Sequence, residues 1–363
     1  MAEIGAPSPS EAERWAWPFT SGDLTAGLRR YLGDNSLKVT GLQPSTLSHR
    51  RPAIGRITGV EAGYKGQRGE GVIKLVVKEP RGTTRTGLAG AGRREVGFYS
   101  SLASQIPMRT PGLVAFSNEG DWIVLEYLDD VREPPSWTPK DYDQAIDALV
   151  GLHDRFWSLT EDLGAFFWLS DPVAADFNVH VAAADKAIQV MIGVGSRGPL
   201  AGSPEQVSLL TRLTREAERV VRPLRSQPGT LLHGDYWPGN IAILPDGIQA
   251  VYDWQLAGVG PAVMDLLVFI NKTDWWFGPL GDERVRLIRH YRARLEAHCG
   301  VAWDDDEWDM LWDHALMWRF LQEWIDLLAA TPEPLFTTRA DQLDQVWLEP
   351  LHMAVSRRLG EQT

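Results

Sequence analysis

The chain has 363 residues and a formal net charge of −12, with 36 Lys and Arg against 48 Asp and Glu. This balance argues against a nucleic-acid partner, because binding to a phosphate backbone depends on clustered basic side chains. No stretch has the roughly 18 consecutive apolar residues of a membrane span, and the single cysteine, Cys299, cannot form an internal disulfide. We therefore expect a soluble cytoplasmic protein, monomeric or homodimeric, that is long enough for two lobes.

The N-terminal part of the sequence predicts a flexible tail, a short helix and a small β-sheet. Residues 1–20 start with a small, polar, Pro-containing segment, which indicates a tail and not a secretory signal. A helix is expected over 21–33, capped by Ser21 or Asp23 and closed by Gly33. Apolar segments between Gly and Pro predict a sheet of about five strands. Strands are placed at 37–44, 54–64, 69–79 and 121–130, and a further helix at 93–106.

From residue 129 onward the sequence predicts mostly helix. Apolar residues recur at helical spacing, and helices are expected at 141–157, 173–193, 204–222, 282–298 and 306–330. A compact β-turn-β segment with a Pro245-Asp246-Gly247 turn interrupts them. This order predicts an α+β fold of two lobes: 21–128, with a small antiparallel sheet and one key helix, and 129–363, which is larger and helical. Ligands favour the cleft of such an arrangement.

The segment from His233 to Asn240 has the groups that phosphoryl transfer requires. That reaction depends on cations at the phosphates, a hydroxyl in line with the phosphorus and a carboxylate near the hydroxyl proton. Asp235, on a tight loop, can orient the hydroxyl and accept its proton, and Asn240 can turn its amide oxygen towards a metal. Asp253, at the end of the next strand, supplies a second metal ligand. One Asn and one Asp suffice for Mg²⁺, because phosphates and water complete its octahedron.

The pattern H-G-D-x-x-x-x-N, followed by a strand that ends in Asp253, resembles the aminoglycoside phosphotransferase and choline kinase-like family. The resemblance covers roughly residues 37–275. It implies a bilobal protein kinase-like fold, with ATP or GTP as phosphoryl donor and Mg²⁺ as cofactor. It also implies that Asp235 is the catalytic base, that Asn240 and Asp253 hold the metal, and that Asp265 braces the catalytic loop.

The same resemblance implies which residues bind the nucleotide. Lys78 would hold the phosphates and Glu95 would position it, although Lys74 lies on the same face of the strand and is an alternative. The hinge residues that would meet the nucleobase are Glu126, Tyr127 and Leu128. No G-x-G-x-x-G motif is present, and the phosphate-covering loop would be formed around Ser45, Thr46 and Ser48.

Acceptor-binding residues are expected in the C-terminal lobe, where the family binds its acceptors. Aromatic rings beside carboxylates suit a sugar, an aminosugar or a quaternary amine. The candidates are Trp275, Trp276, Glu323, Trp324 and Asp326, together with the base Asp235. Against this, Trp residues at helical spacing are usually core residues, and the acidic run at 304–307 suits a capped helix N-terminus.

The expected function is a small-molecule O-phosphotransferase whose acceptor is a hydroxyl of an antibiotic, aminoglycoside-like or nucleoside, or of an aminosugar. Such a protein would confer antibiotic resistance. Two alternatives remain open: a housekeeping kinase of choline, homoserine or a sugar, and an inactive nucleotide-binding module. A protein kinase is not expected, because the sequence lacks an Ala-Pro-Glu motif and has Asp253-Trp254-Gln255 at the metal strand.

Overall fold

The computed structural model describes residues 17–47, 55–80, 88–193, 203–331 and 338–360. The expected phosphate contact Ser48 and most of the tail therefore lie outside the described residues. Contacts within the chain divide it into two units. The first contains Met1–Gly82 and Gly112–Tyr127, and the second contains Thr83–Pro111 and Leu128–Thr363.

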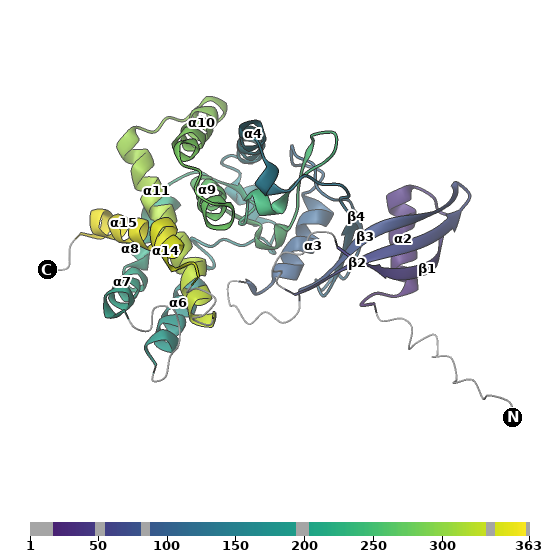
Figure 1. Cartoon of the computed structure of the whole chain (residues 1–363), viewed down its shortest axis with the longest axis horizontal. Helices are drawn as coiled ribbons and strands as arrows, with labels where there is room; N and C mark the ends of the chain where they lie inside the picture. The colour runs from purple at the N-terminus through teal and green to yellow at the C-terminus, as the bar shows by residue number, and fades with distance from the viewer. Residues whose placement is uncertain (1–16, 48–54, 81–87, 194–202, 332–337, 361–363) are drawn as a thin grey trace. The chain divides into compact units, whose positions relative to one another are not determined.

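The first unit is built on a five-stranded sheet in the order β1-β2-β3-β5-β4 (Figure 1). All neighbouring strands in it are antiparallel. Its strands are β1 (Lys38–Ser45), β2 (Arg56–Gly66), β3 (Gly69–Glu79), β4 (Leu113–Phe116) and β5 (Ile123–Glu126). The predicted sheet is confirmed, although β4 was not located in the sequence and β5 is shorter than the strand expected at 121–130.

Helix α2 (Ser21–Leu32) lies against this sheet (Figure 1). Leu24 and Leu28 are fully buried in one cluster with apolar residues of β2 and β3, so one face of the helix is bound to the sheet by hydrophobic packing.

The ends of α2 are held by capping groups. The predicted cap at Ser21 or Asp23 is wrong: Thr20 is the N-cap, and its hydroxyl accepts from the Asp23 amide while the Asp23 carboxylate accepts from the Thr20 amide. Asp23 is thus the second partner of a capping box. Gly33 ends the helix in the left-handed conformation, as predicted.

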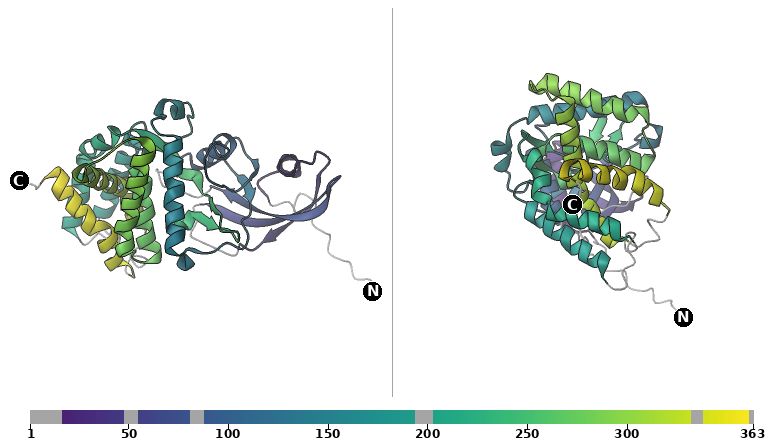
Figure 2. Two further views of the ribbon diagram at one scale, coloured as in Figure 1. Left: turned by 90° about the horizontal axis from the view of Figure 1, so that it is seen from above. Right: turned by 90° about the vertical axis from the view of Figure 1, so that its left-hand side faces the viewer.

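The second unit is mostly helical. Its helices are α3 (Ala91–Ser101), α4 (Pro139–Arg155), α5 (Thr160–Gly164), α6 (Phe177–Ile192), α7 (Pro204–Arg215), α8 (Ala217–Arg225), α9 (Val263–Phe277), α10 (Asp282–Cys299), α11 (Asp305–Arg319), α12 (Ile325–Ala330), α14 (Ala340–Leu343) and α15 (Glu349–Leu359). Two π-helical turns, Phe320–Trp324 and Asp344–Leu348, lie among them. α4 and α10 run side by side (Figure 2).

Several helix boundaries differ from the prediction. The helix expected at 204–222 is two helices, α7 and α8, and the one expected at 306–330 is α11 and α12 joined by a π-helical turn. The helix expected at 93–106 ends at Ser101. α9 was not predicted, because its residues are buried from Val263 to Trp275 and show no polar face. The acidic run begins α11, where Asp304 and Glu307 form a capping box.

Two small antiparallel sheets position the predicted catalytic residues in the second unit. Strand β6 (Gly229–Leu232) pairs with β9 (Gly258–Pro261), and β7 (Ile241–Ile243) pairs with β8 (Gln249–Val251). The segment 233–240 connects β6 to β7, and Asp253 follows β8. The predicted hairpin is confirmed. None of the described helices has the length and apolar character needed to cross a lipid bilayer.

Candidate active site

The segment His233–Asn240, which we call the catalytic loop, turns sharply at Gly234. This residue has a φ of +77°, and a Cβ atom there would lie 2.1 Å from the Leu256 carbonyl oxygen. Only glycine meets both demands, because a side chain is strained at this φ and has no space. The backbone of the loop is thereby fixed just before Asp235.

Asp265, in the first turn of α9, braces the catalytic loop. Its carboxylate accepts hydrogen bonds from the His233 amide at 2.7 Å and the Gly234 amide at 2.9 Å. His153 lies 3.4 Å from the same carboxylate and 2.6 Å from the Tyr291 hydroxyl. Burial alone would raise the pKa of Asp265, but the bonds from His153 and the His233 amide lower it below its usual value. The carboxylate is therefore charged, and the expected brace is present in the geometry.

His233 connects the catalytic loop to the strand that leads to Asp253. Its Nδ1 accepts from the Asp235 amide at 3.1 Å, so Nε2 carries the proton and donates to the Tyr252 carbonyl at 3.0 Å. The ring is fully buried, and this burial lowers its pKa. His233 is therefore neutral and orients the loop.

Asn240 fixes the Asp235 side chain. Its amide nitrogen donates to the Asp235 carbonyl at 2.9 Å and to the Asp235 carboxylate at 3.0 Å. The amide oxygen, at the other end of the group, is directed away from Asp235 and retains its capacity as a ligand. The Asn240 carbonyl accepts from the Tyr252 amide at 3.0 Å, so the loop and the segment before Asp253 are directly bonded.

Asp253 has a left-handed backbone conformation, with φ of +68°. The residues after it are tied to α3: Trp254 stacks on Phe98, and Arg94 donates to the Gln255 carbonyl at 2.9 Å. α3 also contains Glu95, which is 3% exposed. The predicted metal ligand and the predicted partner of the phosphate-binding lysine therefore belong to one packed unit.

Tyr99, also on α3, is affected by the charges of both Glu95 and Asp253. Burial raises the pKa of Tyr99 well above the usual value, and the negative charges of these two residues raise it further.

Within the described residues, no three His, Cys, Asp or Glu side chains converge as a metal-binding group. A site made by Asn240 and Asp253 would thus depend on phosphate and water for its remaining ligands.

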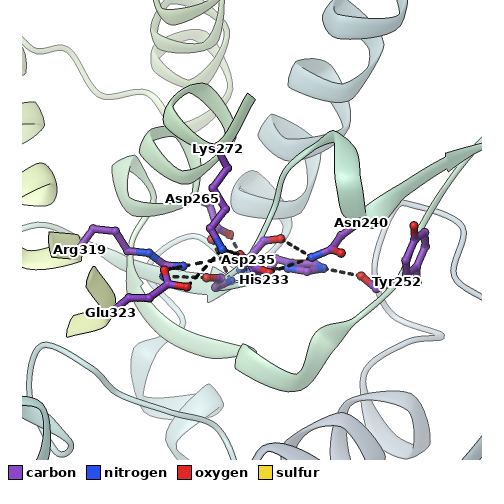
Figure 3. A network of polar contacts seen from close by, with 9 residues as sticks. His233, Asp235, Asn240, Tyr252, Asp265, Lys272, Arg319 and Glu323 are labelled. Carbon is purple, nitrogen blue, oxygen red and sulfur yellow. Dashed lines mark hydrogen bonds and ion pairs between the residues drawn. The ribbon is translucent and has the colours of Figure 1, made fainter. Parts of the chain in front are cut away.

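Two basic residues that the sequence analysis missed meet Asp235 (Figure 3). Lys272 of α9 places its ammonium 2.5 Å from the Asp235 carboxylate and 3.3 Å from that of Glu323. Arg319 of α11 lies 2.5 Å from Glu323 and 3.6 Å from Asp235, and it donates to the Gly234 carbonyl at 2.9 Å. We call Asp235, Lys272, Arg319 and Glu323 the charged cluster.

The predicted acceptor residues are divided between this cluster and the core. Glu323 belongs to the charged cluster, whereas Trp324 is 2% exposed and packs on Trp347 at 4.4 Å. Trp275 is 5% exposed and lies 5.1 Å from Trp324, but Trp276 is 42% exposed. Asp326 is half-buried at the start of α12. Among the five, Glu323 is linked to Asp235 indirectly, because both carboxylates pair with Lys272 and Arg319.

The predicted phosphate-binding lysine is in the first unit. Lys78 lies opposite Ile57 and Ile123 in the sheet and is half-buried. Lys74, four residues earlier on the same face of β3, is exposed and lies 5.7 Å from the Tyr127 ring centre. Both lysines remain candidates for the phosphate contact.

The remaining predicted nucleotide contacts are at strand ends. Glu126 ends β5 and accepts from the Gly112 amide at 2.9 Å, and the Tyr127 amide donates to the Lys74 carbonyl. Ser45 ends β1, with Thr46 directly after it. Leu128 begins the main segment of the second unit.

A family model described as the phosphotransferase enzyme family matches residues 59–303, which is more than half of the chain. The chain belongs to this family. No curated protein matches it detectably in sequence. The expected family and enzyme class are therefore confirmed, and the charged cluster belongs to a phosphotransferase.

Solved structures of kinases share the fold of this phosphotransferase. An ethanolamine kinase from Plasmodium vivax has a TM-score of 0.55 and 14% identity, with 86% of this chain and 83% of that chain covered. The amicoumacin kinase hAmiN has a TM-score of 0.54 and 13% identity, with coverage of 86% and 88%. The choline kinase LicA from Streptococcus pneumoniae has a TM-score of 0.50 and 12% identity, with coverage of 93% and 98%. The expected α+β, kinase-like fold class is thus confirmed.

One signal in the sequence of this phosphotransferase could have revealed Lys272. Lysine is rare in this chain, and this one lies within the apolar stretch 263–277. A charged residue in such a stretch is rarely buried without a partner. No comparable signal marks Arg319, because the segment 305–319 contains many polar residues.

Proposed function

We propose that this phosphotransferase transfers the γ-phosphoryl group of ATP or GTP to a hydroxyl of a small molecule, with Asp235 as the catalytic base. The observation that supports this most directly is the fixed carboxylate of Asp235. Asn240 donates a hydrogen bond to it, and it lies on the catalytic loop that Asp265 braces. A carboxylate held in one orientation can align a hydroxyl and accept its proton.

The transfer exchanges one P–O bond for another. The acceptor oxygen forms a bond to the γ-phosphorus, and the bond from that phosphorus to the β–γ bridging oxygen breaks. Its electron pair leaves with the nucleoside diphosphate, and the hydroxyl proton passes to Asp235. Holding the reacting oxygen in line supplies much of the rate.

Nucleotide binding is assigned to the residues that the family resemblance indicates. We assign the phosphates to Lys78, with Glu95 as its partner, and to the backbone and hydroxyls near Ser45 and Thr46. The nucleobase is assigned to the segment Glu126, Tyr127 and Leu128. Nucleotide use is supported by two solved kinases of this fold, LicA in complex with AMP and hAmiN in complex with AMP-PNP and Ca²⁺.

Asn240 and Asp253 are the proposed ligands of Mg²⁺. The fit is chemical: the Asn240 amide nitrogen is occupied by Asp235, so the oxygen is the end that is available. Asp253 supplies a hard carboxylate oxygen, which Mg²⁺ prefers. When bound, Mg²⁺ neutralises charge on the phosphates.

The acceptor is a small hydroxylated molecule. If the acceptor is an antibiotic or an aminosugar, the protein would confer antibiotic resistance. If the acceptor is choline, homoserine or a sugar, the protein would be a housekeeping enzyme. Solved kinases of this fold are named for choline, ethanolamine and amicoumacin.

The presence of Asp235, Asn240 and Asp253 together disfavours an inactive nucleotide-binding module. We place the enzyme in the cytoplasm on the basis of its one cysteine.

The test is Mg²⁺-dependent release of nucleoside diphosphate from ATP and from GTP, with Asp235→Ala compared with the unchanged enzyme. Asp309→Ala, at an exposed position on α11, is the matched control. We expect turnover to fall by at least about a hundredfold in Asp235→Ala, with nucleotide binding largely retained and the control unchanged. Near-normal turnover in Asp235→Ala would remove Asp235 from its role.

A further inference from the structure

The carboxylate of the proposed base lies among the chain's own cations. The Lys272 ammonium and the Arg319 guanidinium approach the same oxygen of Asp235, at 2.5 Å and 3.6 Å. Both cations are largely buried, with side-chain exposures of 11% and 5%. Charges at such short range and low exposure are weakly screened. Any hydroxyl that reaches Asp235 therefore brings the rest of its molecule close to two positive groups, which also pair with the carboxylate of Glu323.

The two cations are held in different ways. Arg319 is fixed by its bond to the Gly234 carbonyl and by Glu323, four residues later on a π-helical turn. Lys272 is a point charge on a flexible stem, and its two ion pairs, with Asp235 and Glu323, are both to carboxylates. An entering anion can take the place of either carboxylate at Lys272. Arg319 maintains the loop, whereas Lys272 is placed to contact a ligand.

The aromatic rings nearby are also occupied by cations of the chain. The Lys272 ammonium lies 5.8 Å from the centre of the Trp237 ring. The Arg339 guanidinium lies 5.4 Å from the ring of Trp275 and 4.8 Å from that of Trp276. A ring face that already binds a cation offers little to the ammonium of a substrate. This arrangement disfavours the aromatic recognition of an amine that the sequence suggested.

We infer that the acceptor is a hydroxylated anion, with a carboxylate or phosphate group close to the reacting hydroxyl, and that Lys272 binds that group. The inference rests on the proposed function of Asp235. It replaces the aminosugar, aminoglycoside and choline acceptors with hydroxy acids or hydroxylated phosphate esters. Lys272 is then a specificity-determining residue, and its bond to Asp235 is exchanged for one to the acceptor.

Two matched series of compounds test this inference. The first consists of glycerate, glycerol 3-phosphate, glycerol and 2-amino-1,3-propanediol. The second consists of glucuronate, glucose 6-phosphate, glucose and glucosamine. Within each series the hydroxylated skeleton is similar and the charge changes from negative through zero to positive. The carboxylate and phosphate members distinguish the two kinds of anion.

Binding is measured by isothermal titration calorimetry on the full chain with AMP-PNP and Mg²⁺, and turnover by nucleoside diphosphate release. We expect the anionic member of at least one series to bind about tenfold or more tightly than the amine member. In Lys272→Met that preference should shrink to within about twofold, with the KM for nucleotide nearly unchanged. Lys272→Arg, which keeps the charge, should retain the preference, and Lys186→Met, at an exposed position on α6, should behave like the parent.

Four outcomes contradict the inference: equal or tighter binding of the amine member, a preference that survives in Lys272→Met, an effect of Lys272→Met on the nucleotide KM alone, or no binding in either series. Circular dichroism and melting of each variant separate loss of recognition from loss of the fold. Failure of the proposed function gives a different result: turnover is absent, but binding of each compound can still be compared, because calorimetry needs no turnover. An enzyme that phosphorylates glucosamine would retain its function and refute the inference.

Discussion

Phe98 of α3 stacks face to face on Trp254, with ring centres 3.7 Å apart and planes 6° from parallel. Both rings are fully buried. Because Trp254 directly follows Asp253, this stack sets the position of the proposed metal ligand against the helix that contains Glu95. Packing in the core and the geometry of the metal site are thus coupled through one pair of rings.

We predict that Phe98→Leu, which keeps an apolar side chain but removes the stack, lowers the free energy of unfolding by about 1 kcal/mol. The concentration of Mg²⁺ required for half-maximal activity should rise, because Asp253 loses part of its support. Urea denaturation gives the first quantity, and a Mg²⁺ titration of nucleoside diphosphate release gives the second. Phe167→Leu, at a 92% exposed position, is the control. An unchanged Mg²⁺ requirement would show that the stack has no influence on the metal site.

The loop brace leads to a second prediction. In Asp265→Asn one of the two carboxylate oxygens becomes an amide that cannot accept, so the amide of His233 or Gly234 loses its partner. A buried donor without a partner costs about 1–3 kcal/mol of stability. We expect this loss of stability in Asp265→Asn. We also expect kcat to fall by more than the nucleotide KM changes, because the substitution displaces the catalytic loop that contains Asp235. Steady-state kinetics and urea denaturation measure both, and a larger effect on nucleotide KM than on kcat would contradict the brace.

The sequence was most informative where function depends on residues close together in the chain. Asp235, Asn240 and Asp253 lie on one loop and the adjoining hairpin, so their spacing was enough to single them out as candidates for the base and the metal ligands. The hydrogen bond from Asn240 to the Asp235 carboxylate was not predicted. The β2–β3 hairpin and the larger helices other than α9 were also predicted in their order, since alternation and helical periodicity are local signals.

Features that depend on distant packing were not predicted. Strand β4 has four residues, too few for a pattern, and it is a strand because β5 pairs with it. α9 is buried on every side and has no amphipathic period. Lys272 reaches Asp235 only because α9 lies beside the loop, a contact between residues 37 positions apart. The roles of the lysine and arginine in the charged cluster could therefore come only from the fold.

A third prediction concerns two glycines with similar backbone conformations. Gly234 has φ of +77° and Gly247 has φ of +82°, but a Cβ atom at Gly234 would strike the Leu256 carbonyl, whereas none of the described atoms lies within 4 Å of one at Gly247. Gly247→Ala should lower the free energy of unfolding by about 1 kcal/mol for backbone strain alone. Gly234→Ala carries the same strain plus a collision with the backbone, so this variant should be less stable than Gly247→Ala and should be inactive. Denaturation and turnover measured on both variants separate the two costs, and equal stability of the variants would contradict the close approach.

The last prediction concerns pH and His180 of α6, whose ring meets Trp318 edge to face. Burial lowers the pKa of His180 from 6.5 to about 4. The negative charge of Asp176 opposes this shift, and the positive charges of Arg94 and Arg319 add to it. The unfolded chain therefore binds this proton more strongly than the folded chain between about pH 4 and 6.5. The contribution of neutral His180 to the free energy of unfolding is therefore fully present above about pH 6.5. It is lost as the pH falls towards 4, and the loss amounts to about 3 kcal/mol.

We expect His180→Phe, which keeps an aromatic ring but cannot be protonated, to lose correspondingly less stability over this interval than the parent. His352→Phe, at an exposed position on α15, should follow the parent. Urea denaturation at half-unit steps from pH 4 to 7.5 gives the three curves. His233 and His314 also have pKa values lowered by burial, so some pH dependence remains in every variant and the difference between curves is the quantity attributed to His180. Parallel curves for the parent and His180→Phe would mean that the buried imidazole accepts a proton as readily as an exposed one.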